Sequence, residues 1–451
     1  MVTGVRTDAS EATWTASKNL HARARTMFPG GLLHAIRKAD PFPLYFKSGR
    51  GSKKWDADGN EFIDYQVGSG AFLLGHQHPA VLQAMQDQLH TTYHMGRGHP
   101  LELEWGERVQ RIVPNADLMR FTNSGTEAIL LAMRVARAHT RRTKILRFFA
   151  HYHGWQDYAM VGASAPYDTP PGGGVPDQIA ALMVASPTDD LTVRRLLRET
   201  NDIAAVIVEA SGASYGQVPL PPGFLTSLRE ITAAQGVLLI LDETITGFRW
   251  APGGVQQTAG VDADLVTLGK IVSGGMPGAV LVGKESVMQV LDAPLDPRQH
   301  VIHGGTFNAN PLAAAAGIAT LDIVADGEPQ KQADAIAATL RGSLNELFQK
   351  ERIAGCVYGE SSTFHTFFGN CPPREADDDP MWTYDPQILS APADRANTVH
   401  KVLQAHGVDL MSSMSGMTSC EHSDADIERT VDAYAAVIPD LLERGVIQRR
   451  T

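Results

Sequence analysis

The sequence has few cysteines and no long apolar run. Its 451 residues include 3 cysteines, Cys356, Cys371 and Cys420, which are odd in number and lack the spacing of metal ligands. This pattern suits a reducing cytoplasm, where disulfides are rare. No window approaches about 18 uninterrupted apolar residues, and the N-terminus lacks an apolar core of signal-peptide length. We therefore expect a soluble, cytoplasmic protein that does not enter a membrane.

Basic runs and internal repeats are also missing. The chain carries 39 basic and 50 acidic side chains, a net charge of −11, and its basic residues form only short clusters such as residues 141–142. Nucleic acid is therefore not an expected partner. A chain of this length can bury a large core, either in two or three domains or around one large sheet.

Apolar runs that alternate with helical patterns predict the fold class. Residues 144–149, 203–210 and 237–243 are typical of strands buried on both faces, and the segments between such runs carry apolar residues at helical spacing. The pattern predicts an α/β fold with a mostly parallel central sheet covered by helices. Further runs of the same kind occupy residues 180–185, 265–269 and 279–283.

The two ends of the chain differ from this pattern. We expect residues 316–451 to form a smaller α+β domain, which residues 1–75 join, beside a large domain of residues 76–315. The N-terminal part includes a predicted helix over residues 10–28. The sequence DADGN, residues 56–60, has the turn residues of a hairpin.

Polar residues stand at the carboxyl ends of the predicted strands, where open α/β sheets bind their ligands. Ser124, Gly125 and Thr126, in the sequence TNSGTEA, open a helix whose free N–H groups suit a phosphate, although an ordinary helix cap would use the same residues. Tyr152 follows the next strand, and its ring could stack on a flat cofactor or simply pack.

Ionisable residues complete this pattern. Asp242 ends a buried strand, so it needs a cationic or hydrogen-bonding partner, which could be a structural ion pair or a protonated pyridine nitrogen. Lys270 follows another apolar run, where a lysine is either a loop residue with a hydrated ammonium group or a catalytic residue. His151 and His153 flank Tyr152, but no carboxylate or cysteine accompanies them at ligand spacing, so no metal is expected.

Together these features form the set that pyridoxal 5'-phosphate requires: a phosphate cradle, a stacking ring, an acid for the ring nitrogen and a lysine for the aldehyde. The chain resembles the class III aminotransferases, which are fold-type I pyridoxal phosphate enzymes, and within them the branch of glutamate-1-semialdehyde aminomutase. The resemblance runs from about residue 28 to about residue 320. Its motifs are FPGG, WDADGNEFIDY, LLGHQHP, NSGTEA, YHG, DETITGFR, TLGKIVSGGMPG and GGTFNANPLAAAAG.

The resemblance implies a role for each site residue. Lys270 would form the internal aldimine and move the proton between substrate and cofactor, and Asp242 would pair with the pyridinium nitrogen. Tyr152 would stack on one face of the ring, while Thr244 stands where the family usually packs a valine on the other. The remaining cofactor-binding residues would be Ser124, Gly125 and Thr126 at the phosphate, Thr306 from a second subunit, and Glu209, whose alternative role is a structural partner of an arginine.

The implied function is a ping-pong transaminase that moves an amino group from an amine or amino acid to a keto acid, aldehyde or ketone. Because Thr306 would complete the partner's site, the enzyme would be a homodimer. An intramolecular aminomutase of the glutamate-1-semialdehyde type, or an amino acid racemase, is the alternative on the same scaffold. A cofactor-binding protein without turnover is a third reading, which the presence of both Lys270 and Asp242 disfavours.

Three positions depart from the aminomutase pattern. Ser69 stands where the aminomutases carry a tryptophan, and Ser214 and Tyr215 stand where they carry asparagine and methionine. Arg37 matches an arginine that this branch uses on a substrate carboxylate, and a surface arginine is the equal alternative.

The expected pocket has at most one carboxylate anchor and has aromatic residues nearby, Phe72, Tyr93 and Tyr215. It therefore favours a β-amino acid or an aromatic amine as donor. Residues 161–176 form a long Gly/Pro-rich connection that is either a lid over the site or a surface loop.

Overall fold

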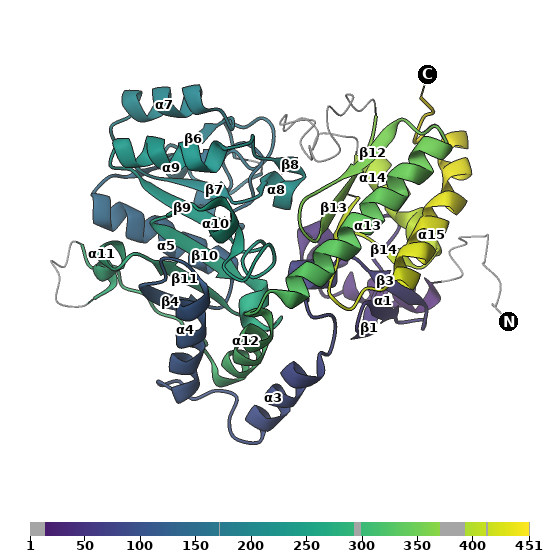
Figure 1. Ribbon diagram of the computed structural model, residues 1–451, viewed down its shortest axis with the longest axis horizontal. Helices are drawn as coiled ribbons and strands as arrows, with labels where there is room; N and C mark the ends of the chain where they lie inside the picture. Colours follow the sequence, from purple (N-terminus) through teal and green to yellow (C-terminus); the bar gives the residue numbers. More distant parts are fainter. Residues whose placement is uncertain (1–13, 171, 293–298, 370–392, 412–413, 451) are drawn as a thin grey trace.

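The computed structural model describes residues 14–170, 172–292, 299–369, 393–411 and 414–450. These residues form two lobes (Figure 1). One lobe contains a seven-stranded sheet, and the other contains a four-stranded and a three-stranded sheet. None of the helices in these ranges is both long and apolar enough to cross a membrane.

The seven-stranded sheet has the order β4-β11-β10-β9-β7-β5-β6. Strand β11 is antiparallel to both neighbours, and all other neighbouring strands pair in parallel. The α/β fold with a mostly parallel central sheet is thus confirmed. The strands are β4 (Leu118–Thr122), β5 (Lys144–Phe148), β6 (Met183–Ser186), β7 (Ile203–Glu209), β9 (Leu238–Glu243), β10 (Leu265–Gly269) and β11 (Ala279–Gly283).

The central strands are mostly apolar because each face of the sheet enters a separate core. In β9, Leu239 and Leu241 belong to the core on one face, and Ile240 belongs to the core on the other. Successive side chains of a strand point to opposite faces, so a strand covered on both sides has no polar face. Helix α5 (Gly125–Thr140) contributes to the second core, and α9 (Phe224–Ala234) to the first.

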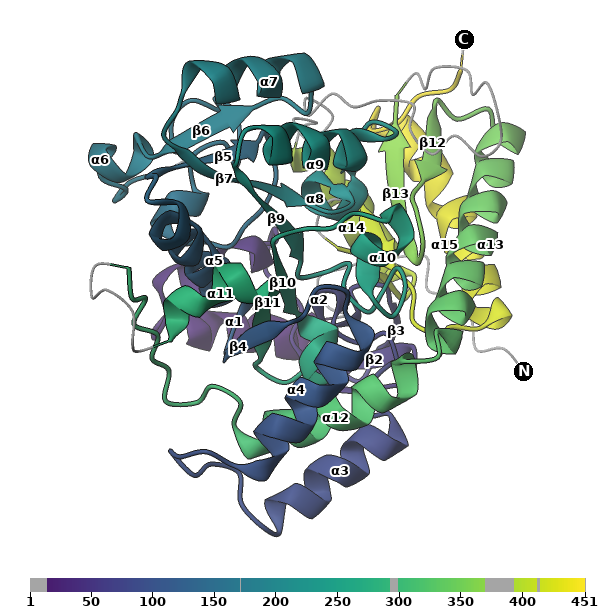
Figure 2. The same cartoon turned by 60° about the vertical axis from the view of Figure 1, so that its left-hand side comes forward.

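Helix α12 (Pro311–Val324) packs between α3 (Pro79–Leu89) and α4 (Pro100–Ile112), as Figure 2 shows. Its apolar residues belong to the larger core as far as Val324. The boundary expected between residues 315 and 316 therefore falls inside this helix. We propose that the larger domain ends instead at the turn of residues 325–327.

In the smaller lobe, strands from the two ends of the chain lie side by side. Strand β3 (Glu61–Asp64), from the N-terminal part, pairs in parallel with β14 (Val408–Asp409). The predicted hairpin is confirmed, since β2 (Lys53–Asp56) and β3 are antiparallel neighbours around the DADGN turn. The remaining elements of this lobe are α1 (Thr15–Ala24), β1 (Phe46–Arg50), α13 (Glu328–Lys350), β12 (Gly355–Tyr358), β13 (Thr363–Phe368), α14 (Ala393–Ala405), β15 (Ser415–Met417) and α15 (Asp424–Glu443).

Short elements connect these units. They are η2 (Pro29–Gly31), η3 (Ala35–Arg37), α2 (Val67–Gly70), η4 (Asp157–Ala159), α6 (Asp177–Ala180), α7 (Asp190–Glu199), α8 (Ala213–Gly216), β8 (Val218–Pro219), α10 (Gly254–Ala259), η5 (Lys270–Ser273), α11 (Glu285–Met288) and η6 (Gln289–Leu291). In the Gly/Pro-rich connection, Tyr167 stacks on Phe149 with ring centroids 4.5 Å apart.

Candidate active site

The carboxyl ends of five strands meet at one edge of the large sheet. Ser124 follows β4, Tyr152 follows β5, Glu209 ends β7, Asp242 lies near the end of β9, and Lys270 follows β10. These strands run in the same direction, so the residues that follow them converge although they are far apart in the sequence.

Asp242 is buried and held by several donors. Its Oδ1 accepts hydrogen bonds from Thr244 N at 3.1 Å, Thr244 Oγ1 at 2.6 Å and Thr267 Oγ1 at 3.1 Å, and its Oδ2 lies 2.8 Å from His153 Nδ1. Burial raises the pKa of Asp242, but the bonds from His153 and Thr244 outweigh it, so the pKa lies below its usual value. The carboxylate is ionised, and Oδ2 has a lone pair for a second donor.

His153 is the main site residue that sequence reasoning missed. Its role was considered only for a metal, whereas its ring pairs with Asp242, 89 positions away. Burial lowers the pKa of His153 despite the neighbouring carboxylate, so the ring is neutral and donates through Nδ1. The sequence feature that could have indicated this role is the position of His153 in the YHG motif, directly after the predicted stacking ring of Tyr152. Within the described residues no cluster of three His, Cys, Asp or Glu side chains could hold a metal.

Lys270 begins the turn η5 with a left-handed backbone, φ 56°. Its side chain is partly buried. Burial lowers the pKa of its amine, the charges of Asp242 and Glu209 oppose that effect, and Arg249 adds to it. The amine is therefore more often neutral, and more nucleophilic toward a carbonyl, than an exposed lysine.

The start of α5 is packed closely against the residues that surround Asp242. Ser124 caps the helix, since its Oγ accepts a hydrogen bond from Glu127 N at 3.3 Å. A Cβ on Gly125 would lie 2.7 Å from Thr244 Cγ2, and a Cβ on Gly154 would lie 2.5 Å from Thr126 Oγ1. The first N–H groups of a helix have no partner within the helix. The Ser124 cap uses only the N–H of Glu127, so the other N–H groups of the first turn can still bind a phosphate.

Glu209 anchors two loops of the site. Its carboxylate accepts hydrogen bonds from Tyr152 N at 2.5 Å, Ser214 N at 3.1 Å and Tyr215 N at 3.1 Å. Burial is the largest influence on Glu209 and raises its pKa to about 7 in spite of these donors. These bonds come from backbone N–H groups rather than from an arginine. Through them Glu209 fixes the position of Tyr152, which is half-exposed.

Two short elements near the Lys270 turn, α2 and α8, contain non-glycine residues with a left-handed backbone. Ser69, in α2, has φ 58° and is exposed, and α2 packs against η5. Ser214 and Tyr215 have φ 52° and 50°. Non-glycine residues in this region are strained, and such strain persists where the surrounding structure requires the conformation.

Tyr215 is buried in a small apolar cluster, hereafter the Tyr215 cluster. Gly70, in α2, would bring a Cβ within 3.0 Å of Met417 Sδ and 3.7 Å of Ile245 Cγ2, and Gly275 would bring one within 2.3 Å of the Phe72 ring. The cluster therefore adjoins both α2 and the glycines that follow Lys270. Its members are Val67, Tyr215 and Met417, with the partly buried Phe72, Ile245 and Met411.

Three of the predicted residues lie on exposed segments. Arg37 is exposed in η3, and Thr306 and Tyr93 are exposed in connections. Asn123 Nδ2 donates to Asn308 Oδ1 at 2.9 Å, so the segment that carries Thr306 lies beside the phosphate cradle of its own chain. The roles of Thr306 across a subunit boundary and of Arg37 at a carboxylate stay predictions.

Arg249, in the DETITGFR motif, joins the two lobes behind the site. It is fully buried and donates to Ser362 Oγ at 3.0 Å, Thr418 O at 2.9 Å and Gly70 O at 3.0 Å. Burial lowers the pKa of this guanidinium to about 10. The sequence alone did not single it out, because its partners come from distant parts of the chain.

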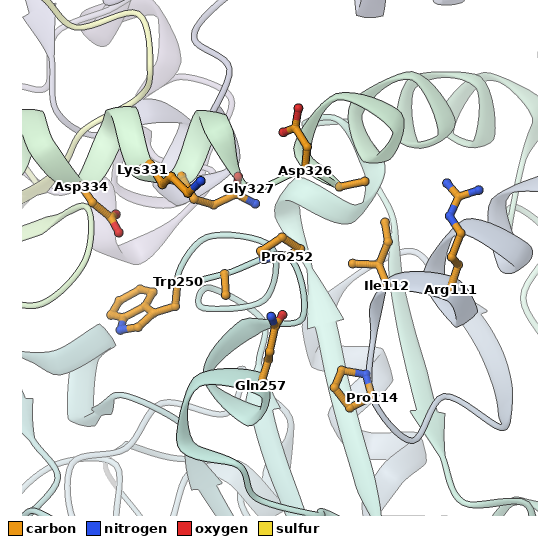
Figure 3. A pocket seen from close by; sticks show the side chains of 13 residues that line it. Arg111, Ile112, Pro114, Trp250, Pro252, Gln257, Asp326, Gly327, Lys331 and Asp334 are labelled. Atoms are coloured by element: carbon orange, nitrogen blue, oxygen red, sulfur yellow. The ribbon is translucent and has the colours of Figure 1, made fainter.

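A cleft of about 680 Å³ lies at the junction of the lobes (Figure 3). Arg111 lines it from the end of α4, Trp250 from the segment before α10, and Lys331 and Asp334 from α13. None of the residues predicted for the active site lines this cleft.

The residues at the sheet edge fit pyridoxal phosphate. The ionised Asp242 has a further acceptor lone pair at Oδ2 for a pyridinium N–H. The start of α5 offers N–H groups to a phosphate, and Lys270 presents an amine of lowered pKa. A Cβ at Gly125 or Gly269 would come within 3.0 Å of Thr244 Cγ2, which explains why these positions need glycine.

Comparisons with known proteins agree with this fit. The model of the family described as aminotransferase class-III matches residues 35–360. The glutamate-1-semialdehyde 2,1-aminomutase of Methanosarcina acetivorans is 35% identical over 432 residues, which is 94% of this chain and 99% of that protein.

Solved structures are similar over almost the whole chain as well. An omega-transaminase from Sphaerobacter thermophilus has a TM-score of 0.85 and 32% identity, covering 94% of this chain and 97% of its own. A β-phenylalanine aminotransferase from Variovorax paradoxus has a TM-score of 0.84 and 28% identity, covering 98% and 97%.

Proposed function

Since the chain belongs to the class-III aminotransferase family and is a pyridoxal 5'-phosphate-dependent enzyme, we propose that it is a transaminase. It moves an amino group from an amine or amino acid to a keto acid, aldehyde or ketone in two half-reactions. A β-amino acid or an aromatic amine is the favoured donor.

The observation that carries this proposal is the Tyr215 cluster beside the Lys270 turn. Apolar and aromatic side chains favour a donor with an apolar body, because burying such a body removes its surface from water. Ser69 adds a small polar side chain on the exposed side of α2. The likeness to the Variovorax β-phenylalanine aminotransferase supports the same donor class.

Each of the site residues has its own task in the proposed reaction. The bound cofactor supplies an aldehyde for the donor nitrogen and a ring that accepts the electron pair of the broken C–H bond. Asp242 holds a proton on the ring nitrogen, and His153 and Thr244 hold Asp242 ionised. Lys270 Nζ moves the proton between the substrate carbon and the cofactor carbon. Tyr152 covers one face of the ring and excludes water from it.

An intramolecular aminomutase is the second candidate. The curated relative from Methanosarcina acetivorans carries this activity in its name and matches 94% of the chain, as do other aminomutases at similar identity. These relatives favour the aminomutase over a transaminase of β-amino acids. Against it stand Ser69, Ser214 and Tyr215, which differ from the aminomutase pattern at three positions near Lys270.

One experiment separates the two candidates. The holoenzyme is given one compound at a time without an acceptor, and the visible absorbance of the cofactor is followed. The compounds are glutamate 1-semialdehyde and one donor from each of the α-, β- and ω-amino acids and the aromatic amines. A transaminase loses that absorbance stoichiometrically and releases a carbonyl product. Isomerisation of glutamate 1-semialdehyde, or racemisation, with no net carbonyl released would overturn the transaminase proposal.

Arg37→Ala tests the carboxylate anchor in the same assay. If Arg37 binds a substrate carboxylate, the variant loses roughly 10- to 100-fold in kcat/KM for amino acid donors, because a charge-assisted bond contributes about 1.5–3 kcal/mol. Plain amines should change little. Lys38→Ala, at the neighbouring exposed position, is the matched control, and equal losses for both donor classes would contradict the anchor.

We also propose that the enzyme is a cytoplasmic homodimer, in which Thr306 reaches the phosphate site of the partner subunit. The exposed apolar side chains Tyr93, Met95, Ile302 and Phe307 support this proposal, since His94 packs on Phe307 and so joins their two segments. Exposed apolar patches of this kind often mark interfaces. Sedimentation of the holoenzyme tests the dimer, and a monomer with full activity would exclude it.

A further inference from the structure

Arg147 is a buried charge within an apolar strand. It lies in β5, between Leu146 and Phe148, and its side chain is fully buried. Burying a guanidinium is costly unless other groups compensate for its charge. The roles assigned so far to the strand ends give no reason for a cation beneath them.

The guanidinium of Arg147 closes the loop that follows its own strand. Nη2 donates to the His151 carbonyl and Nη1 to the Ala159 carbonyl. The residues between these two carbonyls include Tyr152 and His153. The stem of the side chain is closely packed as well, since a Cβ on Gly162 would lie 3.4 Å from Arg147 Cδ.

Arg147 also faces the two carboxylates of the site without bonding to either. Its charge interacts with Glu209 and Asp242, although burial outweighs them and lowers the pKa of Arg147 to about 10. The same charge adds to burial in lowering the pKa values of His151 and His153. Its Nε has no hydrogen-bond partner within the part of the chain that is described.

We propose that Arg147 is a positioning residue for the cofactor ring. Its forked head sets the loop so that Tyr152 lies over the ring and His153 meets Asp242, and its fixed positive charge balances Asp242 and Glu209. A planar fork can bond two carbonyls at once, whereas the ammonium of a lysine at the same position is a single point. This inference rests on the proposed roles of Asp242 and Tyr152 but not on the identity of the amino donor.

The test compares three variants of the holoenzyme. Arg147→Met removes the charge and the fork, and Arg147→Lys keeps the charge alone. Arg142→Met is the matched control, because Arg142 also donates to backbone carbonyls, those of Ile203 and Gly236, but at the opposite edge of the sheet. For each protein we would measure the pH midpoint of the visible absorbance of lysine-linked pyridoxal phosphate, the dissociation constant of the cofactor, and stability to urea.

The groups that face Lys270 are Asp242, Glu209 and Arg249, and the two carboxylates lose their balancing cation in Arg147→Met. The midpoint should therefore rise by about 0.5–1 pH unit, and the cofactor should bind roughly 10-fold more weakly. Arg147→Lys should keep the wild-type midpoint but bind the cofactor several-fold more weakly. Arg142→Met should change neither quantity.

Two failures are distinguishable. If the wild-type protein gives no absorbance of lysine-linked cofactor, and no linkage to Lys270 that borohydride reduces, the proposed site is wrong. If the wild-type protein gives both, but the two Arg147 variants lose stability alone and keep the wild-type midpoint and cofactor affinity, Arg147 has a merely structural role and the inference is overturned.

Discussion

At the scale of single residues, the site is defined by contacts that leave no room for one extra carbon. Gly125 and Gly269 both face Thr244 Cγ2, while the hydroxyl of the same threonine bonds to Asp242 at 2.6 Å. One small side chain therefore separates the phosphate cradle from the strand that precedes Lys270. It also keeps the acid of the ring nitrogen in place.

This packing gives a prediction for Gly125→Ala. The new Cβ would lie 2.7 Å from Thr244 Cγ2, so the start of α5 must move, and the apoenzyme should bind pyridoxal phosphate about 10-fold or more weakly. Adding Thr244→Ser removes that methyl group and keeps the bond to Asp242. The double variant should recover most of the affinity in a spectral titration. Equal affinities of Gly125→Ala and the wild type would show that the cradle tolerates the shift.

At the scale of elements, an ion cluster joins strands from the two ends of the chain. Lys54, in β2, is buried and lies 2.6 Å from Asp64 Oδ1 in β3 and 2.5 Å from Asp409 Oδ2 in β14. Burial raises the pKa values of both aspartates, but Lys54 and the neighbouring histidines outweigh it and hold them below their usual range. The smaller lobe thus depends on one amine between two carboxylates.

Lys54→Met should destabilise the protein by about 3–5 kcal/mol, because it leaves two buried carboxylates without their cation. The loss should be smaller at pH 5 than at pH 8, since the carboxylates can take up protons at the lower pH. Urea unfolding measures both values. Lys53→Met is the control: Lys53 lies 3.8 Å from Asp426 and is partly exposed, so its loss should cost less than about 1 kcal/mol. Similar losses for the two variants would contradict the prediction.

At the scale of the whole molecule, buried neutral histidines connect stability to pH. Burial lowers the pKa of His365 to about 3 and that of His422 to about 4. It also lowers the pKa values of His151 and His153. All of them can take up a proton more easily in the unfolded chain, where a histidine has a pKa of about 6.5.

Stability should therefore be complete above about pH 6.5 and fall as the pH decreases toward 4, by up to about 1.4 kcal/mol per pH unit for each histidine. The measurement is the free energy of unfolding in urea between pH 8 and pH 4.5, and the slope of this free energy against pH checks the prediction. His365→Asn removes one such group and can retain a hydrogen bond to Ser415, which lies 2.8 Å from His365 Nδ1. Its slope should be shallower than that of the wild type, and an unchanged slope would exclude His365 as a contributor.

The sequence by itself determined the strands, the α/β class and the order of the polar residues at the strand ends. These features follow from local patterns: an apolar run of strand length, a turn after it, and a polar residue in that turn. For the same reason it pointed to Lys270 and Asp242, and it predicted a helix opening within residues 124–126, where α5 begins at Gly125.

The tertiary structure decided which of these residues meet, and with what charge. The bonds of His153 to Asp242 and of Glu209 to Tyr152 join positions 89 and 57 residues apart, and no local pattern encodes such distances. Burial likewise depends on what packs from elsewhere, so only the folded chain lowers the pKa of Lys270 and encloses Tyr215 and Arg147. The chemistry of the site comes from residue types, whereas its electrostatics come from the surfaces that folding removes from water.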